Sequence, residues 1–185
     1  MKWLIASDIH GSAYYCQKLF ERYEAEKADR MILLGDVLYH GPRNDLPRDY
    51  APKEVIKILN GIKNEVFSVC GNCDSAVDQM VLEFPVLAEY SVLETDGKLI
   101  FLTHGHIYNE EKPLPMKQGD ILLSGHTHVP KCTKKDELVF MNPGSVSIPK
   151  ENSPHSYMTL ENGVFLWKDL DGEIYHEESF KETLK

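Results

Sequence analysis

Residues 2–12 read "KWLIASDIHGS". The largely apolar run that opens this stretch is typical of a buried strand, and Ser7, Asp8 and His10 follow it directly. Apolar residues at helical spacing then predict a helix over residues 13–27. A strand, a polar turn and a helix in this order predict the start of an α/β fold with functional side chains at the carboxyl end of a strand.

The same pattern recurs four more times along the chain. Each time an apolar run ends and metal-competent side chains follow, after "MILL" (31–34), "VFSV" (66–69), "LIFL" (99–102) and "ILL" (121–123). Asp8 alone could simply cap the helix that follows it. However, five of the eight histidines lie at these strand ends, which argues against isolated core or surface histidines. Because neighbouring strands share a sheet edge, we expect these side chains to converge.

The second half of the chain is predicted to be mainly antiparallel. Two hairpins with strong turn dipeptides are expected, with strands 91–95 and 98–102 around Asp96-Gly97, and strands 157–160 and 164–167 around Asn162-Gly163. A further helix is predicted over 52–63, with a proline in its first turn. The expected fold class is α/β, a four-layer α/β/β/α sandwich of two packed mixed sheets flanked by helices.

Composition limits the classes of function. The chain has 185 residues with no linker or repeat, so residues 1–185 are expected to form a single domain. A formal net charge of −9 argues against stable nucleic-acid binding and against anionic membranes. No signal peptide or membrane span is apparent, and the four cysteines are expected to stay as thiols, so we expect a cytoplasmic protein. An exposed hairpin edge could pair copies into a homo-oligomer.

The motifs resemble those of a known family. Asp8-x-His10, Gly35-Asp36, Gly71-Asn72-x-Asp74, His104 and Gly125-His126-x-His128 resemble, in the same order, the motifs of the calcineurin-like metallophosphoesterase superfamily. The stretches "GDVLYHGPRN", "GNCDS", "THGH" and "NPGSVSIPK" resemble the YfcE group of bacterial phosphodiesterases in particular. The resemblance implies a metal-dependent phosphoric diester hydrolase that acts on a small phosphodiester substrate.

The resemblance also implies a dinuclear metal site in which Asp36 bridges two divalent cations. The first cation would be bound by Asp8, His10, Asp36 and His128, and the second by Asp36, Asn72, His104 and His126. Imidazole and carboxylate ligands suit first-row metals, and the resemblance points to manganese, while the ligand types leave iron, cobalt, nickel or zinc open. A hydroxide that bridges the two cations would attack the phosphorus atom in line.

Cys73 stands where most of the superfamily has a histidine that is credited as the general acid. A neutral thiol is a poor substitute for an imidazolium donor, which favours diesters over monoesters with poor leaving groups.

Cys70 and Cys73 also form a Cys-x-x-Cys pair. A redox pair normally lies at a helix start, and a structural zinc site needs further ligands, whereas Cys16 and Cys132 are isolated in the sequence.

Other residues near these motifs are candidates for the substrate site. Arg43 is a candidate phosphate ligand, because a guanidinium matches phosphate oxygens, and Asn44 and His40 lie in the same loop. His106 is a candidate for a catalytic or a supporting role. Asp74 is expected to orient its neighbours through hydrogen bonds rather than to bind metal.

The turn at residues 142–145, "NPGS", is expected to brace the site.

Two alternative functions stay open at this point. One is a phosphomonoesterase, which Cys73 disfavours. The other is a protein-binding scaffold on the same fold, as in the retromer subunit that shares it. A complete set of seven ligand positions argues against the scaffold, which has no need to retain them.

Overall fold

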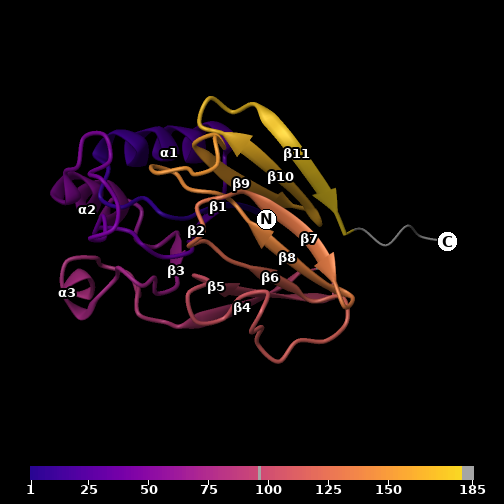
Figure 1. Cartoon of the computed structure of the whole chain (residues 1–185). Helices are drawn as coiled ribbons and strands as arrows, with labels where there is room; N and C mark the ends of the chain where they lie inside the picture. Colours follow the sequence, from indigo (N-terminus) through magenta and orange to yellow (C-terminus); the bar gives the residue numbers. More distant parts are fainter. Residues whose placement is uncertain (96, 181–185) are drawn as a thin grey trace.

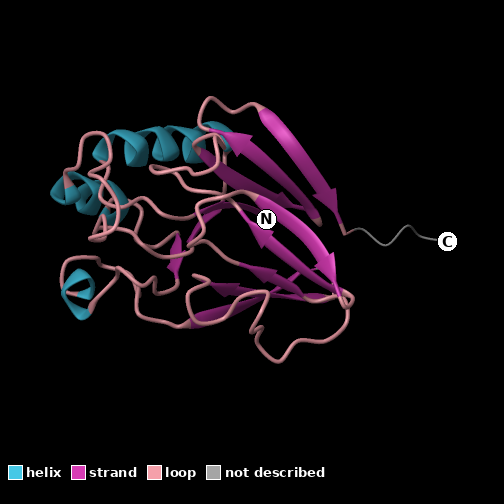
Figure 2. Ribbon diagram, viewed as in Figure 1, coloured by secondary structure: helices cyan, strands magenta, loops and turns pink. Residues whose placement is uncertain are grey.

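The computed structural model describes residues 1–95 and 97–180, and these residues form two packed β-sheets with helices on one side (Figures 1 and 2). The helices of the described part are α1 (Ala13–Glu26), α2 (Pro52–Asn60) and α3 (Ala76–Gln79). None of them is both long and apolar enough to cross a membrane. Ser12 caps α1 by accepting a hydrogen bond from the Tyr15 backbone, so Asp8 is free of the capping role.

The first sheet has six strands in the order β11-β10-β9-β1-β2-β3. Its strands are β1 (Lys2–Ala6), β2 (Arg30–Leu33), β3 (Val66–Ser68), β9 (Ser156–Glu161), β10 (Val164–Asp169) and β11 (Ile174–Ser179). β1, β2 and β3 run parallel, whereas β9, β10 and β11 join them in antiparallel register. The carboxyl ends of three parallel strands therefore meet at one edge.

The second sheet has five strands in the order β4-β5-β6-β8-β7. Its strands are β4 (Tyr90–Thr95), β5 (Lys98–Thr103), β6 (Ile121–Leu123), β7 (Lys131–Lys135) and β8 (Leu138–Asn142). β5, β6 and β8 run parallel, while β4 and β7 flank them in antiparallel register. The carboxyl ends of β5, β6 and β8 therefore meet at one edge of the second sheet.

Alternating side chains fill two separate cores. Along β1, Leu4 and Ala6 face the helices, where they pack with Leu19 of α1 and Leu59 of α2. Ile5 points the other way into the core between the two sheets. Buried parallel strands carry apolar residues on both faces, which explains the uninterrupted apolar runs in the sequence.

The expected α/β sandwich of two packed mixed sheets is confirmed, with two differences of detail. Within residues 1–95 and 97–180, helices cover only the first sheet, because the outer face of the second is covered by the loop 104–120, which packs Leu114 onto Phe101 and Phe140. Two prolines within this loop, Pro113 and Pro115, disfavour a helix there. The loop thus takes the place of the expected fourth layer of helices.

The second half of the chain is less antiparallel than expected. Both hairpins are confirmed as antiparallel pairs, β4 with β5 and β9 with β10, although Asp96 of the first turn lies outside the described residues. The expectation is wrong for β5, β6 and β8, which are parallel neighbours. Long connections join these strands, and such crossovers permit parallel pairing where a two-residue turn does not.

Glu26 at the end of α1 ties this helix to the first sheet. Its Oε1 accepts hydrogen bonds from the Tyr157 hydroxyl at 2.9 Å and from Lys168 Nζ at 2.6 Å. Its Oε2 accepts from Lys2 Nζ at 2.6 Å. Burial opposes ionisation of Glu26, but hydrogen bonds from Lys168, Lys2 and Tyr157 outweigh it and lower the pKa of Glu26 to about 2.

We predict that Glu26→Gln destabilises the protein at neutral pH by about 1–3 kcal/mol, since charge-assisted hydrogen bonds are lost. The pKa of Glu26 is depressed on folding, so its stabilisation is complete above the ordinary value of 4.5 and disappears as pH falls towards 2. Urea unfolding at pH 7 and at about pH 3.5 should show a smaller difference from wild type at the lower pH. Glu24→Gln, at an exposed position of the same helix, is the control. If Glu26→Gln lost the same free energy of unfolding at both pH values, the depressed pKa of Glu26 would be contradicted.

Candidate metal centre

The five turns with metal-competent side chains converge between the carboxyl ends of the two sets of parallel strands (Figure 1). β1, β2 and β3 of the first sheet lead into the turns that hold Asp8 and His10, Asp36, and Asn72. β5 and β6 of the second sheet lead into those of His104, His126 and His128. Most of the seven side chains are buried, while His126 is half-buried and Asn72 is exposed. The two sheets thus contribute to one site.

One group of ligand atoms surrounds the first predicted cation position. Asp8 Oδ1 lies 3.2 Å from His128 Nε2 and 3.5 Å from His10 Nε2. The two imidazole Nε2 atoms lie only 3.4 Å apart. Asp36 Oδ2 completes the group at 3.7 Å from His10 Nε2.

A second group shares Asp36 with the first. Asp36 Oδ2 lies 3.4 Å from His104 Nε2. His104 Nε2 in turn faces Asn72 Oδ1 at 3.2 Å and His126 Nδ1 at 3.3 Å. Asp36 therefore lies between the two groups, and its Oδ2 contacts a histidine of each.

Backbone carbonyls fix how three of the histidine rings face. The Nδ1 atoms of His10, His104 and His128 lie 2.8, 2.6 and 2.7 Å from the carbonyl oxygens of Tyr39, Leu34 and Ile148. A carbonyl oxygen only accepts, so each Nδ1 carries a proton and donates it. Each Nε2 is thereby directed into the cluster, as the outer hydrogen bonds of metal-bound histidines do.

The cluster is rich in electron pairs and attracts positive charge. Asp8 Oδ1 is buried and has no hydrogen-bond partner among the described atoms, although imidazoles face it. Burial opposes ionisation of Asp8, but the imidazoles of His10 and His128 outweigh it and hold the pKa of Asp8 well below its usual range. Burial likewise opposes protonation of His104, but Asp36 and Asp8 raise its pKa to about 9. Divalent cations would satisfy both the orphaned oxygen and the facing imidazoles.

The backbone at this site is unusual. Five of the seven predicted ligands, Asp8, His10, Asp36, His126 and His128, have positive φ angles between 49° and 67°. Residues other than glycine rarely adopt this left-handed conformation, and it persists only where the surroundings enforce it. The turns are thus shaped to aim side chains at one point at some conformational cost.

Glycines let these turns approach one another. A Cβ atom at Gly71 would overlap Asp36 Oδ1, and a Cβ atom at Gly125 would overlap Ser7 Oγ. The close approach therefore requires residues without a side chain at both positions.

Asp74 braces the two turns of the first sheet. Its Oδ2 accepts the backbone N–H groups of Asp36 and Gly71, each at 2.7 Å, and its Oδ1 accepts that of Val37 at 2.9 Å. Cys73 N–H also donates to Asp36 Oδ1 at 2.8 Å. The expectation that Asp74 acts through hydrogen bonds is confirmed.

The segment 142–148 braces the remaining turns, as expected for "NPGS". Asn142 Nδ2 donates to the carbonyl oxygen of Gly125 at 2.7 Å. The hydroxyls of Ser145 and Ser147 donate to the Asp8 carbonyl at 2.9 and 3.0 Å. Because these groups are buried, the bonds fix the position of the Asp8 turn relative to the second sheet.

A cavity of about 370 Å³ opens directly over the ligand cluster. It is lined by Asp36, Asn72, His126 and His128 together with Arg43, Asn44, Cys73 and Lys150. The sequence predicts Arg43 and Asn44 at this site but not Lys150, which is the last residue of the stretch "NPGSVSIPK". Two side-chain cations thus border a site suited to metal, which favours an anionic ligand.

Cys73 lies at the cavity as a free thiol. Burial and the nearby Asp36 carboxylate raise the pKa of Cys73 to about 12, so without metal the thiol is neutral at physiological pH. Cys70 is also free, and α3 begins only at Ala76, so no helix starts at the Cys-x-x-Cys pair. The structure therefore lacks the helix dipole that lowers the pKa of a redox cysteine.

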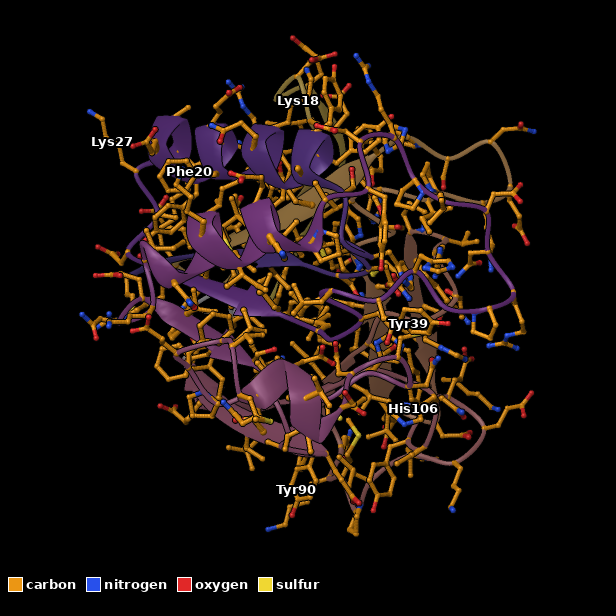
Figure 3. All side chains as sticks on the ribbon, turned by 90° about the vertical axis from the view of Figure 1, so that its left-hand side faces the viewer. Lys18, Phe20, Lys27, Tyr39, Tyr90 and His106 are labelled. Atoms are coloured by element: carbon orange, nitrogen blue, oxygen red, sulfur yellow. The ribbon has the colours of Figure 1, made fainter. Side chains whose placement is uncertain are left out.

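His106 and His40, the other two candidates, do not line the cavity. His106 is exposed, with its ring centroid 5.4 Å from that of His104, and Figure 3 shows it on the same side of the molecule as Tyr39. Partial desolvation of the ring, although the residue is exposed, and the neighbouring His104 lower the pKa of His106. His40, expected at the substrate site, is not among the described residues that line the cavity. Its ring packs edge-to-face on Tyr39 and Tyr50, which holds it away.

Comparison with known proteins places this geometry in a family. Residues 1–163 match the calcineurin-like phosphoesterase superfamily domain. Phosphodiesterase YfcE of Escherichia coli K12 is 46% identical over 164 residues, which cover 89% of each chain. A probable metallophosphoesterase of Bacillus subtilis, YsnB, is 28% identical over 171 residues, which cover 88% of this chain and 86% of that protein.

Solved structures agree with the sequence relatives. The structure of the E. coli phosphoesterase YfcE superposes with a TM-score of 0.94 at 43% identity, covering 98% of this chain and all of that one. Vps29 of Entamoeba histolytica in complex with zinc gives a TM-score of 0.65 at 24% identity, over 98% of this chain and all of the other. The second likeness concerns the fold alone.

We predict that Asp74→Asn weakens both stability and metal binding. An amide offers one acceptor oxygen to three backbone donors, so at least one buried N–H loses its partner, at a cost of about 1–3 kcal/mol. Manganese affinity should fall roughly 10–100-fold, as for other losses of outer-shell hydrogen bonds. Urea unfolding and manganese titration test this, with Asp45→Asn, an exposed carboxylate, as control. Unchanged affinity would show that Asp74 does not position the ligands.

Proposed function

This chain belongs to the calcineurin-like phosphoesterase superfamily, and from that premise we propose that it is a metal-dependent phosphodiesterase with a dinuclear metal site. The family is one of hydrolases, and a relative that is 46% identical carries the name phosphodiesterase. The observation that carries the proposal is the convergence of two ligand groups on Asp36 beside a cavity bordered by Arg43 and Lys150.

The proposed ligand sets follow the two groups of atoms. Asp8, His10, Asp36 and His128 would hold one cation, and Asp36, Asn72, His104 and His126 would hold the other. Two cations held there would supply an attacking hydroxide at neutral pH by lowering the pKa of the water that bridges them, and would stabilise charge on phosphate oxygens. The ligand types suit manganese, our first choice, as well as iron, cobalt, nickel or zinc.

The chain's own residues would bind and orient the substrate. Arg43 and Lys150 would contact phosphate oxygens from the cavity wall, with Asn44 as a hydrogen-bond partner. His106, next to His104 but outside the cavity lining, would contact a substrate group at the rim or support the ligand cluster. Both sheets supply ligands, which supports a single domain over residues 1–185.

Cys73 is proposed to limit the reaction to esters with good leaving groups. Its neutral thiol borders the cavity but cannot supply the charge of an imidazolium donor. Arg43 and Lys150 would still bind a monoester, because it carries more negative charge than a diester. The preference for diesters would therefore arise in turnover rather than in binding.

The alternatives are less well supported. A monoesterase would need a strong general acid, and Cys73 is a weak one. A protein-binding scaffold would not need buried carboxylates and imidazoles gathered into metal-competent groups. Cytoplasmic location, a lack of stable nucleic-acid binding and assembly into a homo-oligomer stay predictions from the sequence.

The direct test is hydrolysis of an aryl phosphodiester by protein stripped of metal and then given manganese. We expect turnover only with metal, and we expect Asp36→Asn to reduce it by about 10²–10³-fold, because the shared ligand loses its charge. Asp45→Asn should behave as wild type. Wild-type turnover of Asp36→Asn with full metal content would refute the bridging role, and no turnover with any of several metals would favour the scaffold.

A second test concerns Cys73. Cys73→His should raise kcat for an alkyl phosphomonoester, whose poor leaving group must be protonated, by about tenfold or more while KM changes little, because a positioned general acid contributes about 10²–10⁴-fold. Cys73→Ser, which again offers a neutral donor, should keep the wild-type preference for diesters. An unchanged diester-to-monoester ratio in Cys73→His would show that this residue does not set the preference.

A further inference from the structure

We propose that Cys132, His176 and Glu178 form a second kind of cation site, which binds Zn²⁺ or a similar borderline divalent cation and clamps the edge strands of the two sheets together. Cys132 lies on β7, the edge strand of the five-stranded sheet (Figure 1). His176 and Glu178 lie on β11, the edge strand of the six-stranded sheet. The proposal is independent of the phosphodiesterase site, with which it shares no residue.

The register of β11 directs both of its residues towards the other sheet. His176 pairs with Trp167 and Glu178 pairs with Phe165, and directly paired residues of antiparallel strands point to the same face. Trp167 and Phe165 are buried in the core between the sheets. The His176 ring packs edge-to-face against Trp167, with centroids 4.8 Å apart. His176, which is exposed, and Glu178, which is half-buried, therefore continue this row at its edge, on the sheet face that carries Trp167 and Phe165.

Cys132 meets them from the opposite sheet. It pairs with Met141 of β8, which is buried in the same core, and Cys132 packs against that core as a half-buried free thiol. Its Sγ lies 3.9 Å from Glu178 Oε2. One ligand atom of each of the three residues lies within 4.8 Å of the others.

These distances are close to those of a zinc site. Zinc binds thiolate sulfur at about 2.3 Å and imidazole nitrogen or carboxylate oxygen at about 2.0–2.2 Å, so tetrahedral ligand atoms lie about 3.3–3.7 Å apart. Small side-chain rotations would bring the three ligand atoms from their present separations to those of a zinc site. The thiol proton passes to solvent on binding, and a water completes the fourth position, as in sites with three protein ligands.

Edge protection is the competing explanation for the polar residues. Inward-pointing charges discourage pairing at sheet edges, and Lys134 Nζ donates to Glu178 Oε1 at 2.8 Å. That ion pair accounts for Glu178 Oε1 but leaves Oε2 directed at Cys132. It also gives no role to a thiol and an imidazole that come together from strands about 44 residues apart.

Cobalt(II) added to the full chain tests the proposal, because a thiolate ligand gives cobalt an intense near-ultraviolet charge-transfer band that oxygen and nitrogen ligands do not. We expect the band in the wild type and in Cys73→Ser, which removes the thiol nearest the other site. It should be absent in Cys132→Ser, and excess Zn²⁺ should abolish it in the wild type. A wild type without the band, or a Cys73→Ser variant that loses it, would overturn the proposal.

The other two positions give a second test by titration of the same band. His176→Gln should weaken cobalt binding by at least roughly 10–100-fold, since even outer-shell partners contribute that much. Lys134→Gln should tighten binding, because it removes the cation that competes for Glu178. Equal thermal unfolding of the metal-free proteins verifies that each variant folds. Unchanged affinity in His176→Gln would exclude its imidazole as a ligand and overturn the site.

Discussion

Side chains that can bind cations are held within hydrogen-bond distance of one another at the point where the two sheets meet. Two imidazole nitrogens of His10 and His128 face each other at 3.4 Å beside the buried carboxylate of Asp8. Such an arrangement is unfavourable without positive charge, and its turns add left-handed backbone conformations. The rest of the fold supplies the rigidity that this arrangement requires, through apolar cores on both faces of the first sheet.

Hydrogen bonds to the backbone transmit that rigidity to the ligands. Asp74 connects the turns of β2 and β3 within the first sheet, and Asn142 connects the end of β8 to the turn of β6 within the second. Ser145, which follows β8, bonds to the Asp8 turn and so connects the two sheets. Both kinds of brace act on main-chain atoms, so they set where a ligand's Cα lies before its side chain is considered. Carbonyls such as Tyr39 O then set how the ring faces. The position of each ligand residue and the orientation of its side chain are thus controlled by separate contacts.

Features that depend on local pattern were predictable from the sequence. Apolar runs followed by Asp8 or His104 predicted strands with ligands at their carboxyl ends, because parallel strands share an edge. Features that depend on tertiary placement were not predictable. Lys150 borders the cavity because its segment folds back beside His128. Cys132 contacts Glu178 only because the edge strands β7 and β11 of the two sheets lie next to each other. His40 shows the limit of sequence proximity, since its ring does not line the cavity although Arg43, three residues away, does.

The charge distribution bears on the size of the substrate. The chain carries a formal charge of −9, yet Arg43 and Lys150 border the cavity, and the proposed cations would add positive charge beneath them. Fields from the acidic surface are screened over about 8–10 Å at physiological salt, so one phosphate inside the cavity interacts mainly with these local cations. A polyanion would place its other phosphates outside that range, against a net acidic surface, and would bind less well. The electrostatics therefore favour a small diester whose main negative charge lies on the phosphate that is cleaved.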